Sequence, residues 1–153
     1  VSETSAVSSM QAVSLRGLKE EQEIIVQGRG EAVSPYSSRL AAAVSLSSGE
    51  VLVTGGRGRD RQVFLLSGPG LATWRSRASM KRGRLGHAAV SLELGGQEVV
   101  MVAGGWDKGG RALASVELFS LKKNQWQEVT QMQAPRVDFA LQVRLLLLNP
   151  HKS

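Results

Sequence analysis

The sequence predicts an all-β protein made of repeated four-stranded antiparallel sheets, and two observations lead there: the composition and an internal repeat. The chain has 153 residues, of which 17 are glycine and only seven are aromatic, namely three Trp, three Phe and one Tyr. Many glycines with few aromatics are typical of short strands joined by tight turns around an aliphatic core. The length suits one ordinary domain.

The internal repeat is the more specific of the two observations. Six landmarks occur twice in the same order, with an offset of 46 residues at the first pair, 49 at the Gly-Gly pair and 52 from the tryptophans onward. Small insertions in loops explain this drift, and a period near fifty indicates a repeat architecture. The paired landmarks are Ala42–Leu46 with Ala88–Leu92, Val51–Gly56 with Val100–Gly105, Val63–Leu66 with Val116–Phe119, Trp74 with Trp126, Met80 with Met132, and Arg84 with Arg136.

Each copy contains four short segments with the length and composition of strands. The second segment of each copy ends at a Gly-Gly pair, where the chain can turn with positive φ. Four such strands joined by turns describe a twisted antiparallel sheet of the kind that forms one propeller blade. In chain order the expected strands are Leu40–Leu46, Val51–Thr54, Gln62–Leu66 and a strand centred on Trp74, then Ala88–Leu94, Glu98–Ala103, Ala114–Leu121 and a strand centred on Trp126.

These landmarks resemble the kelch repeat. The resemblance rests on the Gly-Gly that closes the second strand, on Phe119 seven residues before Trp126, on Met132, and on Arg84-Leu-Gly-His87 at the start of a unit. It spans Leu40 to Leu141 and implies an incomplete kelch-type β-propeller with four-stranded antiparallel blades. Closed rings need at least four blades, so we expect the other blades from a longer chain or from oligomerisation.

The resemblance divides the chain into four parts. Residues 38–83 and 84–135 are expected to be kelch blades. Residues 1–37 are expected to be a degenerate or partial blade with a polar N-terminal lead, and residues 136–153 the start of a truncated blade and a tail. A coincidental pair of strands explains the first part equally well, and a frayed apolar tail is the alternative for the last.

Catalytic chemistry has little support in the sequence. The chain has no cysteine and two histidines, which leaves no cluster with metal-ligand spacing. No Gly-x-Ser-x-Gly nucleophile motif occurs, and the acidic residues are scattered. We therefore expect no enzyme activity, no metal and no cofactor. His87 resembles a kelch histidine that packs beside the next blade.

Positive charge is concentrated in the first repeat. The formal net charge is +6, and eight basic residues with a single acid lie between Thr54 and Gly86. In an up-and-down blade, the turn after the second strand and the link to the next blade lie at one end of the sheet. This end resembles the partner-binding surface of kelch propellers. The expected partner-binding residues are Arg57, Arg59, Arg61, Arg75, Arg77, Arg84, Trp106, Asp107, Lys108, Arg111 and Arg136.

Arginine suits bidentate binding of carboxylate or phosphate, so an acidic or phosphorylated protein partner is expected. Trp106 in a glycine-rich turn is a candidate aromatic anchor. Two plainer interpretations stay open: the arginine loops are merely solvated, or Trp106 lies under the neighbouring blade. Nucleic acid is less favoured, because the basic segment lacks interleaved aromatics to stack on bases, and no segment is long and apolar enough to span a membrane.

The sequence therefore predicts a protein–protein interaction module. The resemblance implies substrate recognition for a ubiquitin ligase adaptor or an actin-associated scaffold. The alternative is an accessory propeller segment of a larger enzyme whose catalytic residues lie outside this chain. The lack of cysteines and of glycosylation sequons favours a cytoplasmic setting.

Overall fold

A computed structural model describes residues 39–71, 73–139 and 141. The described residues all belong to one compact unit of the chain. None of the described segments forms a helix that is long and apolar enough to cross a membrane. The expected partial blade at residues 1–37 and most of the tail at 136–153 lie outside the described residues.

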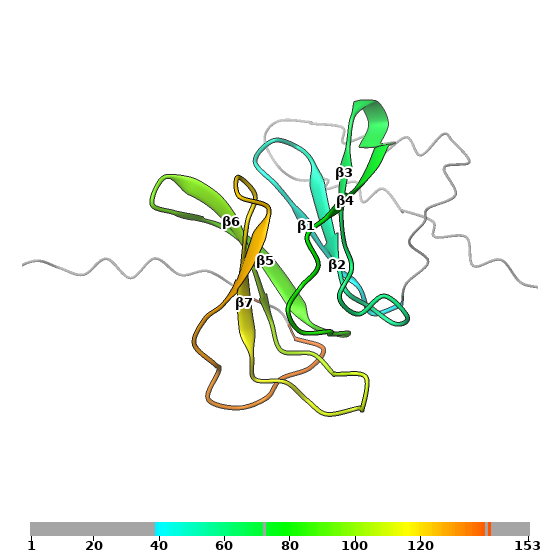
Figure 1. Cartoon of the computed structure of the whole chain (residues 1–153), viewed down its shortest axis with the longest axis vertical. Coiled ribbons are helices and arrows are strands. Elements are labelled where there is room, and N and C mark those ends of the chain that lie inside the picture. The colour runs from blue at the N-terminus through cyan, green and yellow to red at the C-terminus, as the bar shows by residue number, and fades with distance from the viewer. Residues whose placement is uncertain (1–38, 72, 140, 142–153) are drawn as a thin grey trace, which may run out of the picture. The chain divides into compact units, whose positions relative to one another are not determined.

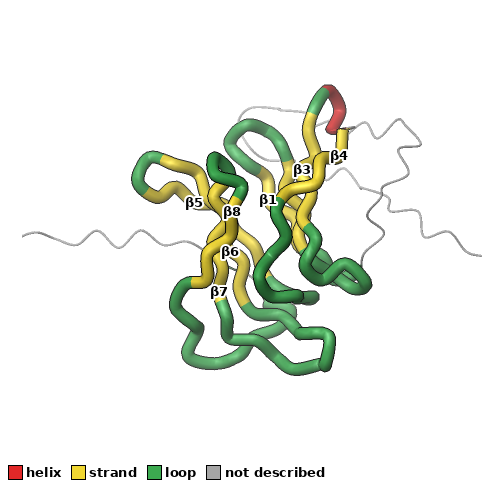
Figure 2. Tube along the Cα trace, in the orientation of Figure 1, coloured by secondary structure: helices red, strands yellow, loops and turns green. Residues whose placement is uncertain are grey.

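The first sheet contains four antiparallel strands in the order of the sequence. Figure 1 shows these strands in cyan to green. A short 3₁₀ turn, η1 (Pro69–Leu71), joins the last two strands and is the one red segment in Figure 2. Gly70 takes positive φ in this turn (65°), which fits the glycine there. The strands are β1 (Ala42–Ser45), β2 (Val51–Thr54), β3 (Val63–Ser67) and β4 (Thr73–Arg77).

The second sheet repeats this arrangement. Its four strands are also antiparallel and neighbour one another in sequence order. The predicted all-β fold of four-stranded antiparallel, blade-like sheets is confirmed. The strands are β5 (Ala88–Leu94), β6 (Gln97–Ala103), β7 (Val116–Ser120) and β8 (Gln125–Glu128).

Several strand boundaries differ from the sequence prediction, and the two that differ by two residues do so for physical reasons. Leu40 was expected in the first strand, but it has φ 65° and is exposed, so β1 begins at Ala42. β7 begins at Val116 instead of Ala114, because the segment before it is still part of the turn from β6. The division of the chain at residues 38, 84 and 136 stays a prediction.

The hydrophobic core lies between the two sheets. Because side chains opposite each other in an antiparallel pair share one face, Leu52 and Leu65 lie on one face of the first sheet. Val100 and Phe119 likewise share a face of the second sheet. These four residues belong to one buried cluster, in which Leu52, Val100 and Phe119 have no exposed area. Each sheet therefore buries one face by packing on the other.

The first glycine of each Gly-Gly pair lies where a side chain would not fit. A Cβ atom at Gly55 would be 2.4 Å from the backbone oxygen of Arg84, and one at Gly104 would be 2.4 Å from that of Arg136. Both glycines also have positive φ, 61° and 65°. The lack of space for a Cβ atom and the positive φ together require glycine at these two equivalent positions.

Candidate functional site

Three segments meet at one end of the two sheets. They are the β2–β3 loop at 55–62, the β6–β7 loop at 104–115, and the link at 78–87 that leads from β4 to β5; Figure 2 shows all three as green loops. A hollow of about 300 Å³ lies between them. Its lining comes from both sheets and consists of Arg57, Gly58, Asp60, Leu85, Trp106, Asp107, Lys108 and Gly110.

A backbone pair between the link and the β6–β7 loop contributes to the wall of this hollow. The Leu85 N–H donates to the Trp106 oxygen at 3.0 Å, and the Trp106 N–H donates to the Leu85 oxygen at 2.7 Å. Trp106 is partly buried. Trp106 is therefore neither a fully exposed aromatic anchor nor a ring hidden beneath the neighbouring sheet. One part of its surface still faces the hollow.

The charged groups of the hollow differ in how they are held. The Asp107 carboxylate accepts hydrogen bonds from the backbone N–H of Gly109 at 2.8 Å and of Arg111 at 2.9 Å. Asp60 forms a loose ion pair with Lys108, at 3.6 Å between nitrogen and oxygen. The Lys108 side chain is 80% exposed, whereas that of Asp60 is 14% exposed. The acids are therefore held inside the loops while the cations extend into solvent.

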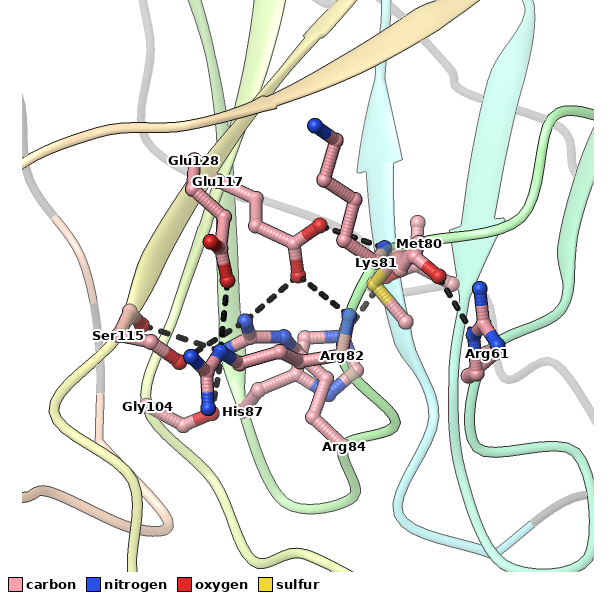
Figure 3. A network of polar contacts seen from close by, with 11 residues as sticks. Arg61, Met80, Lys81, Arg82, Arg84, His87, Gly104, Ser115, Glu117 and Glu128 are labelled. Atoms are coloured by element: carbon pink, nitrogen blue, oxygen red, sulfur yellow. Dashed lines mark hydrogen bonds and ion pairs between the residues drawn. The ribbon is translucent and has the colours of Figure 1, made fainter.

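Arg84 is not part of this exposed surface, which corrects the sequence expectation. Its side chain has no exposed area. Figure 3 shows the guanidinium pointing into the second sheet, where it pairs with the Glu117 carboxylate at 2.7 Å. It also donates to the Gly104 oxygen at 2.8 Å and to the Ser115 oxygen at 3.2 Å. Arg84 joins the two sheets and is not available to a partner.

Glu117 also accepts hydrogen bonds from backbone groups of the same link. Its carboxylate accepts the backbone N–H of Lys81 at 2.7 Å and that of Arg82 at 3.3 Å. The Arg82 side chain pairs with Glu128 at 2.6 Å on the exposed side of the link. The hydrogen bond of this pair, together with the attraction between the two charges, raises the pKa of Arg82 and lowers the pKa of Glu128. Much of the basic segment therefore serves to attach one sheet to the other.

Arg75 and Arg77 also lie away from the hollow, because both are in β4 and not in a loop. Arg77 donates to the Leu121 oxygen of the second sheet at 3.0 Å, and its guanidinium carbon is 5.9 Å from the centre of the Phe119 ring. Arg75 is exposed in the middle of the strand. The structure places these two arginines in β4 and not in the loop cluster, because β4 continues through them, and their expected role in partner binding stays a prediction.

The remaining predicted residues, except Arg136, belong to the converging segments. Arg59 donates to the Gln62 side chain at 2.9 Å, and Arg61 donates to the Met80 oxygen at 2.7 Å. Both bonds shape the β2–β3 loop and the link beside it. Arg111 is exposed on the β6–β7 loop, and Arg136 is exposed after β8. The structure therefore brings together Arg57, Trp106, Asp107 and Lys108 at the hollow, with Arg59, Arg61 and Arg111 on its loops.

His87 is a buried structural residue at the end of the link. Its Nε2 lies 2.7 Å from the Thr54 hydroxyl, and its Nδ1 has no hydrogen-bond partner in the described part of the chain. Burial, with a smaller effect of the Arg84 charge, lowers the pKa of His87 to about 3. The ring is therefore neutral at physiological pH and packs at the junction of the two sheets.

Sequence reasoning missed three residues that matter here. Asp60 and Leu85 line the hollow. Glu117 accepts hydrogen bonds from Lys81 and Arg84 of the link. Asp60 was visible as the single acid within the basic segment. Glu117 carried a signal as well, since strand alternation puts it on the same face as Phe119, where a charge needs a buried partner.

Within the described residues, no group of three or more His, Asp or Glu side chains could hold a metal ion.

The fold and the site define a protein of tandem four-stranded β-sheets with a loop-lined hollow at their junction. Residues 95–133 match the family model of the Kelch motif. This range covers the β6 to β8 part of the second sheet, so the expected resemblance to the kelch repeat is confirmed there. A kelch motif indicates a protein–protein interaction module. No curated protein matches the chain in sequence.

Proposed function

We propose that this chain binds an acidic or phosphorylated segment of another protein at the hollow between the β2–β3 and β6–β7 loops. The observation that carries the proposal is the outward placement of cations around an aromatic wall. Arg57 and Lys108 are exposed at the hollow, and Trp106 and Leu85 offer apolar surface next to them. A carboxylate or phosphate beside an apolar side chain would complement this surface.

The acids of the hollow do not cancel this preference. Asp107 already accepts two backbone N–H groups, and Asp60 is mostly buried. A ligand anion would meet Lys108 before Asp60, because the Lys108 side chain is the more exposed of the two. Arg111 adds a further exposed charge on the same loop. Such exposed contacts steer association and respond strongly to salt.

A narrower proposal concerns the biological setting. A kelch module of this kind would serve as the substrate-recognition part of a ubiquitin ligase adaptor or as an actin-associated scaffold, acting without catalysis and in the cytoplasm. The kelch motif supports only the protein–protein interaction role on which this narrower proposal rests. Cosedimentation with actin filaments distinguishes the two roles, since only the scaffold role predicts that the chain pellets with filaments.

The direct test uses a labelled glutamate-rich peptide with a central leucine, and its binding is followed by fluorescence anisotropy. Matched peptides replace the glutamates by glutamine or add a phosphoserine. We expect binding of the acidic peptides only, weakened by added salt. The variant Arg57→Ser/Lys108→Ser/Arg111→Ser should bind roughly tenfold more weakly, because each exposed charge pair contributes about 0.2–1 kcal/mol.

A matched variant removes the same charge elsewhere. Arg75, Lys122 and Lys123 are exposed and lie away from the hollow. Replacing these three by serine lowers the net charge equally, so a general charge effect would weaken binding in both variants. Equal losses in the two variants, or equal binding of the glutamine peptide, would contradict the proposal.

A further inference from the structure

The two sheets are also joined at the end opposite to the hollow. The β1–β2 turn at residues 46–50 lies at the other end of the first sheet from the β2–β3 loop, because β2 runs between the two (Figure 1). In this turn the Ser47 hydroxyl donates to Oε2 of Glu98 at 2.6 Å, and the Ser47 N–H donates to Oε1 at 2.8 Å. Glu98 belongs to β6 of the second sheet. Ser47 therefore attaches this turn to the neighbouring sheet.

The Glu98 carboxylate is held by neutral donors. The Ser91 hydroxyl donates to it at 2.9 Å. The hydrogen bond from the Ser47 side chain, with smaller effects of the Ser47 backbone and of Ser91, lowers the pKa of Glu98. Glu98 forms no ion pair within the described residues, and the residue directly opposite it in β5 is another acid, Glu93. The surroundings of Ser47 are therefore negatively charged.

The sequence around Ser47 carries a second, independent signal. Glu50 follows it by three residues, and none of the other described Ser or Thr residues has an acid at this spacing. Protein kinases read such charge patterns in their substrates, and an acid three residues after the serine is the pattern that acid-directed kinases recognise. Ser47 is exposed and Glu50 is partly exposed. The serine with this pattern is thus also the one that contacts the second sheet.

The turn has to open before a kinase can bind it in extended form. The Leu46 N–H donates to the Glu50 oxygen, and the Gly49 N–H donates to the Leu46 oxygen, both at 2.9 Å. Leu46 is buried, whereas residues 47–49 are exposed. Exposed turns with few buried contacts open locally at a small cost in free energy. Phosphorylation would therefore act on the open state of this turn.

We propose that Ser47 is a phosphorylation site of an acid-directed kinase, and that its phosphate detaches the β1–β2 turn from the second sheet. The γ-phosphoryl group of ATP moves to Oγ of Ser47. The bond from the γ-phosphorus to the bridging oxygen breaks, the new O–P bond forms, the hydroxyl proton passes to the base of the kinase, and ADP leaves. The modified side chain has lost the hydrogen that Glu98 accepts, and it carries a charge of about −1.5 to −2 at pH 7.

The phosphate and the Ser47–Glu98 contact oppose each other. The new charge lies beside the Glu98 carboxylate, with Glu93 next to it, so repulsion destabilises the attached turn. By reciprocity, a change that weakens the contact favours phosphorylation. The Arg84–Glu117 pair holds the other end of the junction. Phosphorylation of Ser47 therefore loosens one end of the junction, and this proposal does not depend on the hollow.

The first experiment locates the phosphate. The folded full chain is incubated with purified casein kinase II and Mg-ATP, and peptide mass spectrometry follows the reaction. We expect one phosphate, on Ser47, and a severalfold slower reaction in Glu50→Gln. Glu98→Gln should react severalfold faster, because the turn opens more easily. Glu93→Gln removes the same charge on the adjacent strand without touching Ser47, so it should react at the wild-type rate.

Thermal unfolding followed by circular dichroism measures the consequence. The phosphorylated chain should melt at least about 4 °C below the unmodified one. Most of this loss should disappear in Glu98→Gln and persist in Glu93→Gln, because only Glu98 contacts Ser47. The proposal is overturned if Ser47 is not phosphorylated, if Glu50→Gln reacts at the wild-type rate, if the phosphate leaves the melting temperature unchanged, or if it costs the same in Glu98→Gln.

Discussion

The guanidinium of Arg84 and the carboxylate of Glu117 form an ion pair of 2.7 Å in which both side chains are completely buried. The pair connects the link after the first sheet with the third strand of the second sheet. The carboxylate also accepts two backbone N–H groups of that link, so its charge is well compensated. This one acidic residue fixes the link to the second sheet.

Loss of one partner of this pair should be costly. We expect Arg84→Met to reduce the free energy of unfolding by about 3–5 kcal/mol, because Glu117 is then buried without its counter-charge. Urea denaturation followed by tryptophan fluorescence measures this change. The double variant Arg84→Met/Glu117→Gln should lose clearly less than the sum of the single changes. Additive losses would show that the two residues act independently.

The glycine at the end of β2 should be required for steric reasons as well as for its φ angle. Gly55 and Gly58 both have positive φ, 61° and 80°, but a Cβ atom meets other atoms only at Gly55. We expect Gly58→Ala to lower stability by roughly 1–2 kcal/mol, the cost of a left-handed alanine. Gly55→Ala should cost clearly more, since the Arg84 oxygen lies 2.4 Å from the added atom. Equal losses in thermal unfolding would rule out the close contact.

Stability should decrease in mild acid because of His87. Its pKa is about 3 in the folded protein and 6.5 when unperturbed. Between these values the unfolded chain binds a proton that the folded protein does not, so stability falls as pH falls from 6.5 towards 3. The slope approaches about 1.4 kcal/mol per pH unit for one proton.

The range from pH 6.5 to 5.5 isolates this histidine from the carboxylates, whose ordinary pKa is 4.5. Hydrogen bonds from Ser47 lower the pKa of Glu98, and the bond from Arg82 lowers that of Glu128, so these acids add to the loss only at lower pH. Urea midpoints of His87→Gln across this range should depend less on pH than those of the wild type. An unchanged dependence would contradict the role given to His87.

Trp126 should be essential to the junction of the two sheets. Its ring is 6% exposed and lies 4.8 Å from the Phe119 ring, and its Nε1 donates to the Ala78 oxygen at 2.7 Å. We expect Trp126→Ala to cost about 3–5 kcal/mol in unfolding free energy. Trp126→Phe should cost less, because it keeps a buried ring and loses mainly the hydrogen bond. A fully stable Trp126→Ala variant would argue against this packing.

The repeat made most of the fold predictable from the sequence. The Gly-Gly pairs and the two tryptophans marked both sheets, because turns and core aromatics leave local signals in a sequence. The site was predicted less well. Whether an arginine is buried depends on its neighbour across the junction, and the partners of Arg77 and Arg84 lie 44 and 33 residues away in sequence. A local pattern can mark a buried charge such as Glu117, but it does not show which distant residue pairs with it.

The central claim is that the loops of both sheets form one partner-binding hollow at Trp106. The most direct measurement is the shift of the three tryptophan indole N–H signals in a ¹⁵N-labelled full chain titrated with the glutamate-rich peptide. The signal of Trp106 should move in a saturable and salt-dependent manner, while those of Trp74 and Trp126 stay in place. A silent Trp106, or equal shifts of all three signals, would contradict the claim.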